Sequence, residues 1–197
     1  RGRHSHNLAE RGYEVTGIDL SPEAIKTAKE KAEELNLSNV QFEVGDMRDP
    51  LPQKFDAIVN LFTTFGYFKS DKENASVLDS VTRMLKDEGL FVLDYLNAEK
   101  VKQDFVAEEE GEFHGIRYEI KRYIKNGAIH KDIAFAGDQL DKPRVYWERV
   151  KLYGLGWFKK EMAKRELEII DVNGDYQGSD FDPDTSPRLL IISRLSK

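Results

Sequence analysis

Apolar and polar positions alternate in short, regular blocks over the first hundred residues. The run from Tyr13 to Asp19 is short and contains β-branched residues, so it predicts a strand that ends on an acid. A helix is expected from Ser21, whose side chain can cap it, to Leu35, because apolar residues recur there at helical spacing. A short helical stretch from Ser5 to Glu10 precedes the strand, and Gly12 suits the turn between them.

The alternation of strands and helices continues to residue 95. Val40–Val44 alternates like a half-buried strand, whereas 55–62 and 89–95 are mostly apolar, as in strands covered on both faces. Between the last two, Ser70 and Glu73 form a capping box that opens a helix to Leu85. Such an order predicts a parallel sheet with right-handed crossovers.

The alternation of strands and helices ends after Asp104. The later runs predict three strands, a helix and two further strands, over 112–125, 128–135, 145–153, 156–165, 167–172 and 189–195. Asn126-Gly127 is a strong hairpin signal between the first two. We therefore predict that residues 1–104 and 154–197 form a doubly wound, mostly parallel α/β core, and that residues 105–153 form an antiparallel β insert.

Composition narrows the class of protein. The chain has 197 residues, 40% apolar and 34% charged, which fits one soluble globular domain with room for an insert. It contains no cysteine, so this segment has no disulfides, thiolate metal sites or cysteine nucleophiles, and a cytoplasmic location is the default expectation. Its apolar runs are too short to span a bilayer.

The charge of the chain is uneven. A net charge of −6 argues against a general nucleic-acid binder. From Arg117 to Arg165, however, 13 Lys and Arg stand against 6 Asp and Glu, a local balance of +7. Solvated faces of strands and helices are the ordinary explanation of such a segment, and an anionic substrate or an RNA surface is the alternative.

Three predicted strands end in groups that suit a ligand, and ligands of doubly wound sheets bind at such ends. Asp19 can accept hydrogen bonds from both hydroxyls of a nucleotide ribose, or can only close a turn. Asp46 follows the next strand, where an adenine amino group could be met, with Met47 against the ring. Four aromatics around Gly66, among them Phe62, would form an apolar wall or pack beneath the next helix.

The residues before Asp19 look like the second half of a nucleotide-binding βαβ unit. Gly2 stands where the last glycine of a G-x-G-x-x-G turn would lie, and the earlier glycines and the first strand are absent. That strand is normally buried on both faces of its sheet. We therefore expect the sequence to be part of a longer protein, with the first strand missing from the given chain.

Together these segments resemble the class I S-adenosylmethionine-dependent methyltransferases over nearly the whole chain. The segments that carry the resemblance are, in order, Gly2-Arg3-His4, Gly17-Ile18-Asp19-Leu20-Ser21, Gly45-Asp46-Met47, Phe55-Asp56-Ala57-Ile58-Val59 with Leu61-Phe62, and Met84 to Val92. The usual Pro-Gly-Gly turn of this family is here Asp87-Glu88-Gly89. Within the class, the chain is most similar to small-molecule N- and O-methyltransferases that carry a β insert after the fifth strand.

The resemblance implies a Rossmann-like sheet, S-adenosylmethionine as cofactor and S-adenosylhomocysteine as product. It places at the cofactor Gly2, His4, Asp19, Leu20, Asp46, Met47 and Phe62. Methyl transfer is then an in-line displacement onto N or O of a small-molecule acceptor in a dry pocket. A general base is optional, and the four histidines are weak candidates: His6 and His114 have no visible partner, and His130 stands beside Lys131.

Substrate contacts are expected after the fourth and fifth strands and from two later segments. The candidates are Tyr67, Asp94, Tyr95, Asn97, Tyr176 and Arg149. The turn 174–178 could bring Tyr176 to the active edge, or be a plain turn. The inserted sheet that carries Arg149 could form a wall or lid over the pocket, or a dimer contact. The expected partner is thus a small molecule, without a membrane, and the protein is a monomer or homodimer.

Three other functions stay open. A nicotinamide-dependent dehydrogenase would use Asp19 equally well, although Gly45-Asp46-Met47 and the lack of a second nucleotide-binding half weigh against it. A tRNA or RNA methyltransferase fits the basic segment. A catalytically silent cofactor-binding or scaffold protein fits the incomplete glycine motif.

Overall fold

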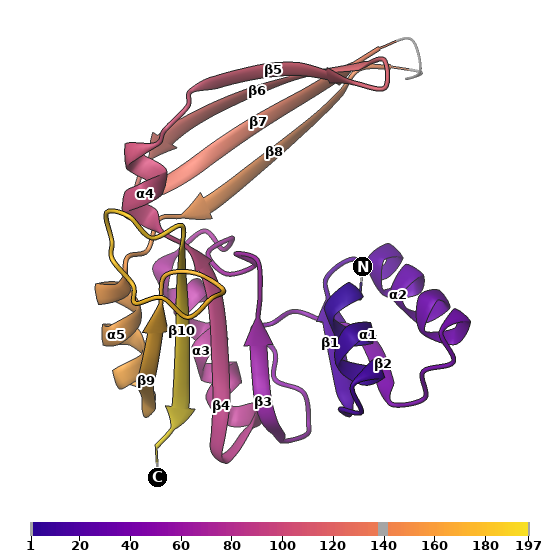
Figure 1. The fold of residues 1–197 in the computed structure, drawn as a ribbon, viewed down its shortest axis with the longest axis vertical. Coiled ribbons are helices and arrows are strands. Elements are labelled where there is room, and N and C mark those ends of the chain that lie inside the picture. Colours follow the sequence, from indigo (N-terminus) through magenta and orange to yellow (C-terminus); the bar gives the residue numbers. More distant parts are fainter. Residues whose placement is uncertain (1, 138–141, 197) are drawn as a thin grey trace. The chain divides into compact units, whose positions relative to one another are not determined.

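The computed structural model describes residues 2–137 and 142–196 (Figure 1). The chain divides into two compact units, Arg1–Leu51 and Pro52–Lys197. The separator expected between the strands of the insert includes residues 138–141, which lie outside the described residues. No helix within the described part is long and apolar enough to cross a membrane.

The first unit contains two parallel strands and two helices. Its elements are α1 (Arg3–Glu10), β1 (Val15–Asp19), α2 (Pro22–Glu34) and β2 (Val40–Val44). The strands pair from Val15 opposite Val40 to Asp19 opposite Val44, so both end at the same edge. Ser21 caps α2, since its hydroxyl accepts a hydrogen bond from the Ala24 amide at 3.1 Å. The predicted strand–cap–helix sequence is confirmed here.

A small apolar core joins these elements. Ile25, Ala28 and Ala32 of α2 pack with Phe42 of β2. His6 fastens α1 to this core: it is buried, its Nε2 lies 2.9 Å from the Ala28 carbonyl oxygen, and its ring meets Phe42 edge-on. The expectation that His6 lacks a partner is therefore wrong. Gly2 (φ 78°) directly precedes α1, at a place where a Cβ would lie 2.8 Å from the Ala28 Cβ, so only glycine fits this approach.

The second unit contains a four-stranded sheet in the order β3-β4-β10-β9 (Figure 1). The strands are β3 (Phe55–Asn60), β4 (Leu85–Leu96), β9 (Leu167–Asn173) and β10 (Arg188–Leu195). β3 runs parallel to β4, and β10 runs antiparallel to β4 and β9. Three of the four strands therefore run the same way, which agrees with the mostly parallel sheet that the pattern predicts.

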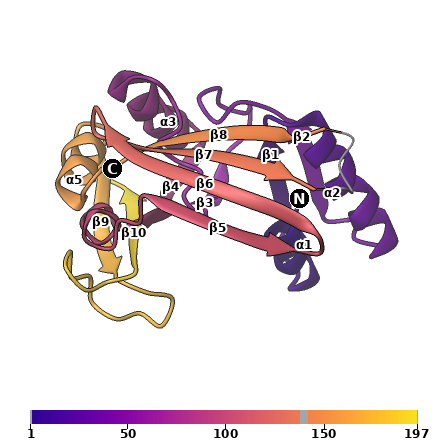
Figure 2. The same cartoon turned by 90° about the horizontal axis from the view of Figure 1, so that it is seen from above.

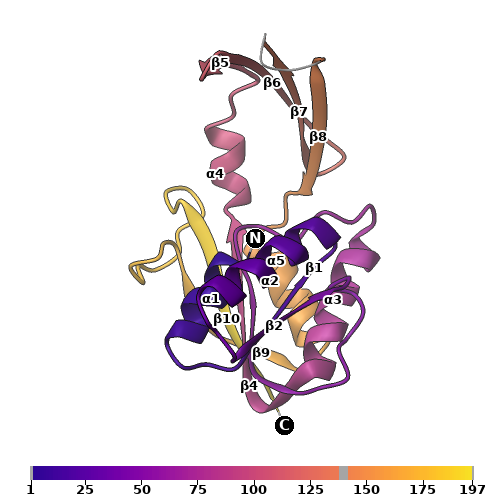
Figure 3. The same ribbon diagram turned by 90° about the vertical axis from the view of Figure 1, so that its right-hand side faces the viewer.

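Helices α3 (Asp71–Met84) and α5 (Leu155–Ala163) contact each other and lie against this sheet (Figure 3). Both halves of the predicted capping box are present at Ser70 and Glu73. β4 begins at Leu85, four residues earlier than expected. Leu85 follows the last residue of α3 and already has an extended backbone conformation. The pairing with β3 then shifts register between Phe55 and Ala57, which accommodates the turn at Glu88 and Gly89.

A second, antiparallel sheet follows α4 (Ala98–Gln103), in the order β5-β6-β7-β8 (Figure 2). Its strands are β5 (Glu108–Phe113), β6 (Ile116–Lys125), β7 (Ala128–Ala136) and β8 (Arg144–Lys151). The hairpin at Asn126-Gly127 is confirmed, with positive φ at both residues. The prediction of one strand over 112–125 is wrong, because His114 and Gly115 also have positive φ and turn the chain. β5 is acidic and pairs on one side only, so its sequence lacks the apolar alternation of a strand.

Candidate functional site

The carboxyl ends of β1 and β2 form one candidate site in the first unit. The Gly45 amide donates to the Asp19 carbonyl oxygen at 3.1 Å, so the two strand ends adjoin. The Asp19 carboxylate is exposed, and its Oδ1 accepts from the Ser21 amide at 2.8 Å. Its Oδ2 has no partner within residues 2–137 and 142–196. A free carboxylate oxygen at the end of a parallel strand fits the hydroxyls of a ribose, and Leu20 beside it is 61% exposed.

Asp46 has a different environment. Its Oδ1 accepts from the Arg48 amide at 2.9 Å and from Nε at 3.1 Å, and its Oδ2 accepts from Nε at 3.1 Å and Nη2 at 2.7 Å. The Arg48 guanidinium holds the pKa of the Asp46 carboxyl below its usual range. Because the single Nε hydrogen is shared between both oxygens, these bonds use three N–H groups of Arg48. Asp46 therefore shapes the turn that carries Met47, and an adenine amino group competes with Arg48 for its oxygens.

The two cofactor-side candidates on α1 belong to the same unit. Gly2 is the first residue before the helix, in the left-handed conformation. His4 is exposed, and its Nε2 lies 3.3 Å from the Arg3 guanidinium. The structure thus brings Gly2, His4, Asp19, Leu20, Asp46 and Met47 into one compact unit, whereas Phe62 belongs to the second.

In the second unit, Asp94 at the carboxyl end of β4 is the centre of a hydrogen-bond network. Its side chain is 2% exposed. Oδ1 accepts from Arg188 Nε at 2.8 Å and Nη2 at 2.6 Å, while Oδ2 accepts from the Tyr176 hydroxyl and the Phe62 amide, both at 2.9 Å. Burial and the nearby Asp94 carboxylate raise the pKa of the Tyr176 phenol. Asp94 is thus a positioning group whose lone pairs are used within the protein.

This network holds a strained loop. Phe62 and Thr63 have φ of 57° and 59°, which is costly for residues other than glycine. The Thr63 amide donates to the Asp94 carbonyl oxygen at 3.0 Å, and Arg188 Nη2 donates to the Thr63 hydroxyl at 2.9 Å. The loop leaves the Phe62 side chain 51% exposed, whereas Phe65 is fully buried. The two alternatives for the aromatic cluster therefore apply to different residues. Phe65 packs beneath a helix, α5, and Phe62 forms an exposed apolar surface.

Sequence reasoning identified Asp94 and Tyr176 but missed Arg188. The arginine lies 94 residues from Asp94 along the chain. The two meet because β10 runs antiparallel to β4, with Arg188 opposite Leu96, so the start of one strand adjoins the end of the other. The available signal is a basic residue just before the predicted strand 189–195, and such a residue by itself identifies no partner.

Two predicted substrate contacts are instead structural. Tyr95 is fully buried against Phe65 and Phe158, its hydroxyl donates to the Lys151 carbonyl oxygen, and burial raises its pKa. Asn97 is 2% exposed, caps α4, and donates to the carbonyl oxygens of Pro183 and Ser186. Neither side chain is open to a substrate, because both are buried. Alternation along β4 points Tyr95 into the core of the second unit.

Arg149 is fixed to the loop after β3. Its Nη2 donates to the Tyr67 carbonyl oxygen at 3.0 Å, and Nη1 lies 3.4 Å from the Lys69 carbonyl oxygen. The Lys151 amide donates to the Gly66 carbonyl oxygen at 2.9 Å. Tyr67 is 46% exposed, and burial together with Glu148 raises the pKa of its phenol. The antiparallel sheet is thus held against the loop that the aromatic cluster forms.

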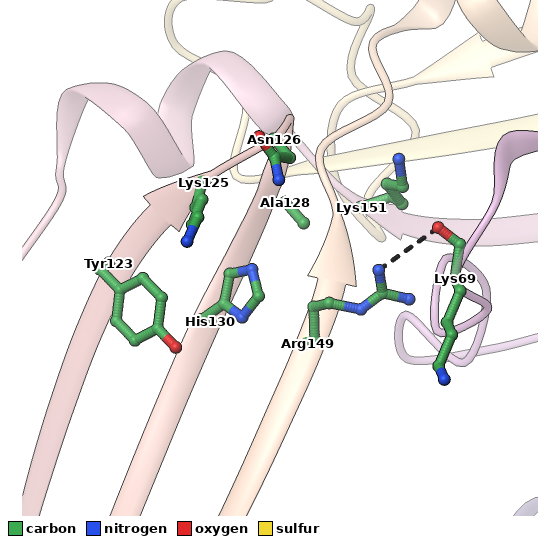
Figure 4. A pocket seen from close by; sticks show the side chains of 8 residues that line it. All are labelled: Lys69, Tyr123, Lys125, Asn126, Ala128, His130, Arg149 and Lys151. Carbon is green, nitrogen blue, oxygen red and sulfur yellow. Dashed lines mark hydrogen bonds between the residues drawn. The ribbon is translucent and has the colours of Figure 1, made fainter.

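A cavity of about 370 Å³ opens beside Arg149 (Figure 4). Its lining comes from the loop after β3, from the end of β6 and the start of β7 with the turn between them, and from the end of β8. The residues are Lys69, Tyr123, Lys125, Asn126, Ala128, His130, Arg149 and Lys151. The cavity was not among the expectations from sequence, which singled out only Arg149 for the substrate and His130 as a weak base candidate.

A pH-dependent contact supports the junction between the sheet and the loop. Lys151 Nζ lies 2.8 Å from Asp71 Oδ1, and the Tyr153 hydroxyl donates to the same oxygen at 2.8 Å. Both bonds lower the pKa of the Asp71 carboxyl. A lowered pKa in the folded state contributes stability at high pH that is lost as the pH falls through that lowered value.

We therefore expect Asp71→Asn to reduce the melting temperature at pH 7 and to change it little in strong acid. The difference between the two proteins should shrink as the pH falls below about 4, the ordinary pKa of Asp. Thermal melts of both proteins from pH 7 to pH 2.5 measure it. A difference that stays constant over this range would contradict the assignment.

Comparisons with known proteins agree with this arrangement. The family model of the methyltransferase domain matches residues 1–147. Glycine/sarcosine N-methyltransferase of Aphanothece halophytica is 25% identical over 185 residues, 89% of this chain and 66% of that protein. YqeM of Bacillus subtilis (strain 168), provisionally named a methyltransferase, is 35% identical over 106 residues, 53% of this chain and 42% of that protein. The chain thus spans less than two thirds of the length of these relatives.

The fold itself is shared with solved structures. The crystal structure of an S-adenosylmethionine-dependent methyltransferase from Clostridium acetobutylicum ATCC 824 superposes with a TM-score of 0.89. The match covers 100% of this chain and 80% of that one, at 18% sequence identity. At this identity the likeness concerns the fold, which is the mixed α/β architecture that the sequence pattern predicts.

Proposed function

This chain belongs to the methyltransferase domain family, and we propose that it transfers a methyl group from S-adenosylmethionine to a nitrogen or oxygen of a small-molecule acceptor. The observation that supports the proposal most is the free carboxylate oxygen of Asp19 at the end of β1. It lies beside Gly45, at the point where two parallel strands end together. Ligands of open α/β sheets bind at such edges.

The proposed roles on the cofactor side follow the environment of each residue. Bound S-adenosylmethionine supplies a methyl group that is already activated on a sulfonium. Asp19 accepts hydrogen bonds from the ribose hydroxyls, and Leu20, 61% exposed, offers apolar surface beside them. Asp46 fixes the turn of Met47 through Arg48. Gly2 and His4 are proposed to complete these contacts within the first unit, and the contact of Phe62 with the cofactor stays a prediction from the sequence.

The acceptor side is proposed to involve Tyr67, Tyr176 and Arg149 in the second unit. Asp94 positions Tyr176 and the Phe62–Thr63 loop, and it is not proposed as a base because its oxygens are already bonded. The name of the Aphanothece halophytica relative states an amine substrate, which favours a small acceptor for this chain as well. A cytoplasmic location and the choice between monomer and homodimer stay predictions.

The test of this proposal is a binding experiment with the intact protein. We expect S-adenosylhomocysteine to bind in isothermal titration and to raise the melting temperature, and NADH to do neither. Binding of NADH without S-adenosylhomocysteine would favour the dehydrogenase instead. Binding of S-adenosylhomocysteine without transfer of labelled methyl to a panel of amines and alcohols would favour a catalytically silent protein.

A further inference from the structure

The register of the antiparallel sheet collects the lining of the cavity on one face. Tyr123 of β6, His130 of β7 and Arg149 of β8 are direct cross-strand neighbours, and Lys125, Ala128 and Lys151 form the adjacent row. Because opposed residues in a β-ladder point to the same side, these six side chains share a face. Figure 4 shows them around the cavity, with Lys69 opposite from the loop after β3.

The lining is strongly cationic. It contains Lys69, Lys125, Arg149 and Lys151, and none of its eight residues is acidic. One of these groups, Lys151, is paired with a carboxylate, that of Asp71. Asp132 lies one row farther along the same face, opposite Lys121 and Trp147. In the part of the chain that the structure describes, the ammonium groups of Lys69 and Lys125 have no ion-pair partner.

Arg149 and Lys151 are held in place within the lining, whereas Lys69, Tyr123 and Lys125 are exposed. Arg149 is fixed by two carbonyl oxygens, and the Lys151 side chain is only 15% exposed. The rings of Tyr123 and His130 stack with centroids 4.7 Å apart and an angle of 8°. Like charges held close together repel one another, and a bound anion relieves that repulsion. A row of solvated lysines does not by itself explain why an arginine is held by two backbone carbonyls beside a cavity.

We propose that this cavity binds the anionic group, a phosphate or a carboxylate, of the methyl acceptor. This inference rests on the proposed methyltransferase function and names the class of its substrate. Arg149 supplies a planar guanidinium for two oxygens of the anion, and Lys69 and Lys125 supply its charge balance. The stacked rings of Tyr123 and His130 form the aromatic side of the same cavity.

The size of the cavity favours a small molecule over RNA. About 370 Å³ is within the range of pockets for small ligands, roughly 300–1,000 Å³. RNA presents rows of phosphates, and proteins meet it with extended basic surfaces rather than with one cavity of this size. A small acceptor with one or two anionic groups therefore matches both the charge and the volume.

The experiment compares the intact protein with Lys125→Gln and Lys69→Gln in titrations with inorganic pyrophosphate and with succinate. Neither lysine side chain has a hydrogen bond or ion pair with another described residue, so both variants should fold like the wild type. Lys121→Gln is the matched control: it lies on the same face of β6 but outside the lining, and its charge pairs with Glu119 at 2.9 Å. Each titration is repeated at low and high salt, and S-adenosylhomocysteine binding is measured for all four proteins.

For the anion that the wild type binds more tightly, we expect Lys125→Gln and Lys69→Gln each to raise the dissociation constant about tenfold, as for the loss of one charged hydrogen bond. Lys121→Gln should bind this anion like the wild type. The tighter of pyrophosphate and succinate identifies phosphate or carboxylate as the group. Equal binding by wild type and lining variants would overturn the inference, as would an RNA oligonucleotide whose binding needs Lys125 and which neither anion displaces. Loss of S-adenosylhomocysteine binding in every protein with anion binding intact would refute the proposed function instead.

Discussion

Replacement of Asp94 by Asn is expected to lower the free energy of unfolding of the second unit by about 3 kcal/mol, the lower part of the range for breaking a buried ion pair. The substitution removes the charge that balances Arg188, whose side chain is 23% exposed, while Asp94 is 2% exposed. It also places an NH2 group, itself a donor, where two of the four donors now meet an oxygen of the carboxylate. The partial exposure of Arg188 places the effect at the lower end, because water can still reach the guanidinium.

The same substitution should release the loop after β3. Phe62 and Thr63 have positive φ, and the Asp94 and Arg188 side chains bond both residues. Without that network the loop is expected to relax toward ordinary conformations, since each strained residue costs about 1–3 kcal/mol. Proteolysis or hydrogen exchange at residues 61–68 should therefore increase beyond what the lower global stability explains.

Urea denaturation followed by tryptophan fluorescence measures the effect, because Trp147 and Trp157 both belong to the second unit. Asp56→Asn is the control, since that carboxylate is exposed and pairs with Lys86 on the surface, so its loss should not move the transition. Adding Arg188→Gln to Asp94→Asn should recover part of the loss. A double variant as unstable as the sum of the single ones would show that the two residues act independently.

Replacement of Asp19 by Ala is expected to weaken the binding of S-adenosylhomocysteine by about 1–3 kcal/mol, because two buried ribose hydroxyls lose their acceptor. Isothermal titration measures this as a five- to 150-fold rise in the dissociation constant, within the conversion of about 1.4 kcal/mol to tenfold. Asp19→Asn should lose less, since its amide oxygen can still accept from the Ser21 amide and from one hydroxyl.

The control for this prediction is Glu14→Ala, just before the opposite end of the same strand. It should leave the affinity for S-adenosylhomocysteine unchanged. All three variants should unfold at nearly the same temperature, because Asp19 and Glu14 are exposed and lie outside the apolar core of the first unit. Unchanged affinity in Asp19→Ala would remove this residue from the ribose and leave it only the role of closing a turn.

Local patterns predicted those parts of the site that depend on neighbours in the chain. The strand that ends at Asp19 and the cap at Ser21 are within three residues of each other, so their geometry follows from backbone preferences. Where an element lacked its own signal, the prediction was wrong. The acidic strand β5 pairs only with β6 among the described strands, and its own sequence has no apolar alternation. The turn at His114-Gly115 lies between the apolar residues Phe113 and Ile116, so no polar break marks it in the sequence.

By itself, the sequence determined the alternation of strands and helices, the antiparallel insert, the resemblance to class I methyltransferases and the position of Asp19 at a strand end. Only the tertiary structure decided the rest. It paired Asp94 with Arg188 and Tyr176, buried Tyr95 in the aromatic core, and gathered the cationic cavity from a loop and three strands. The physical reason is distance along the chain: hydrophobic periodicity and capping act within one element, whereas burial, ion pairing and strand register depend on residues brought together only by folding.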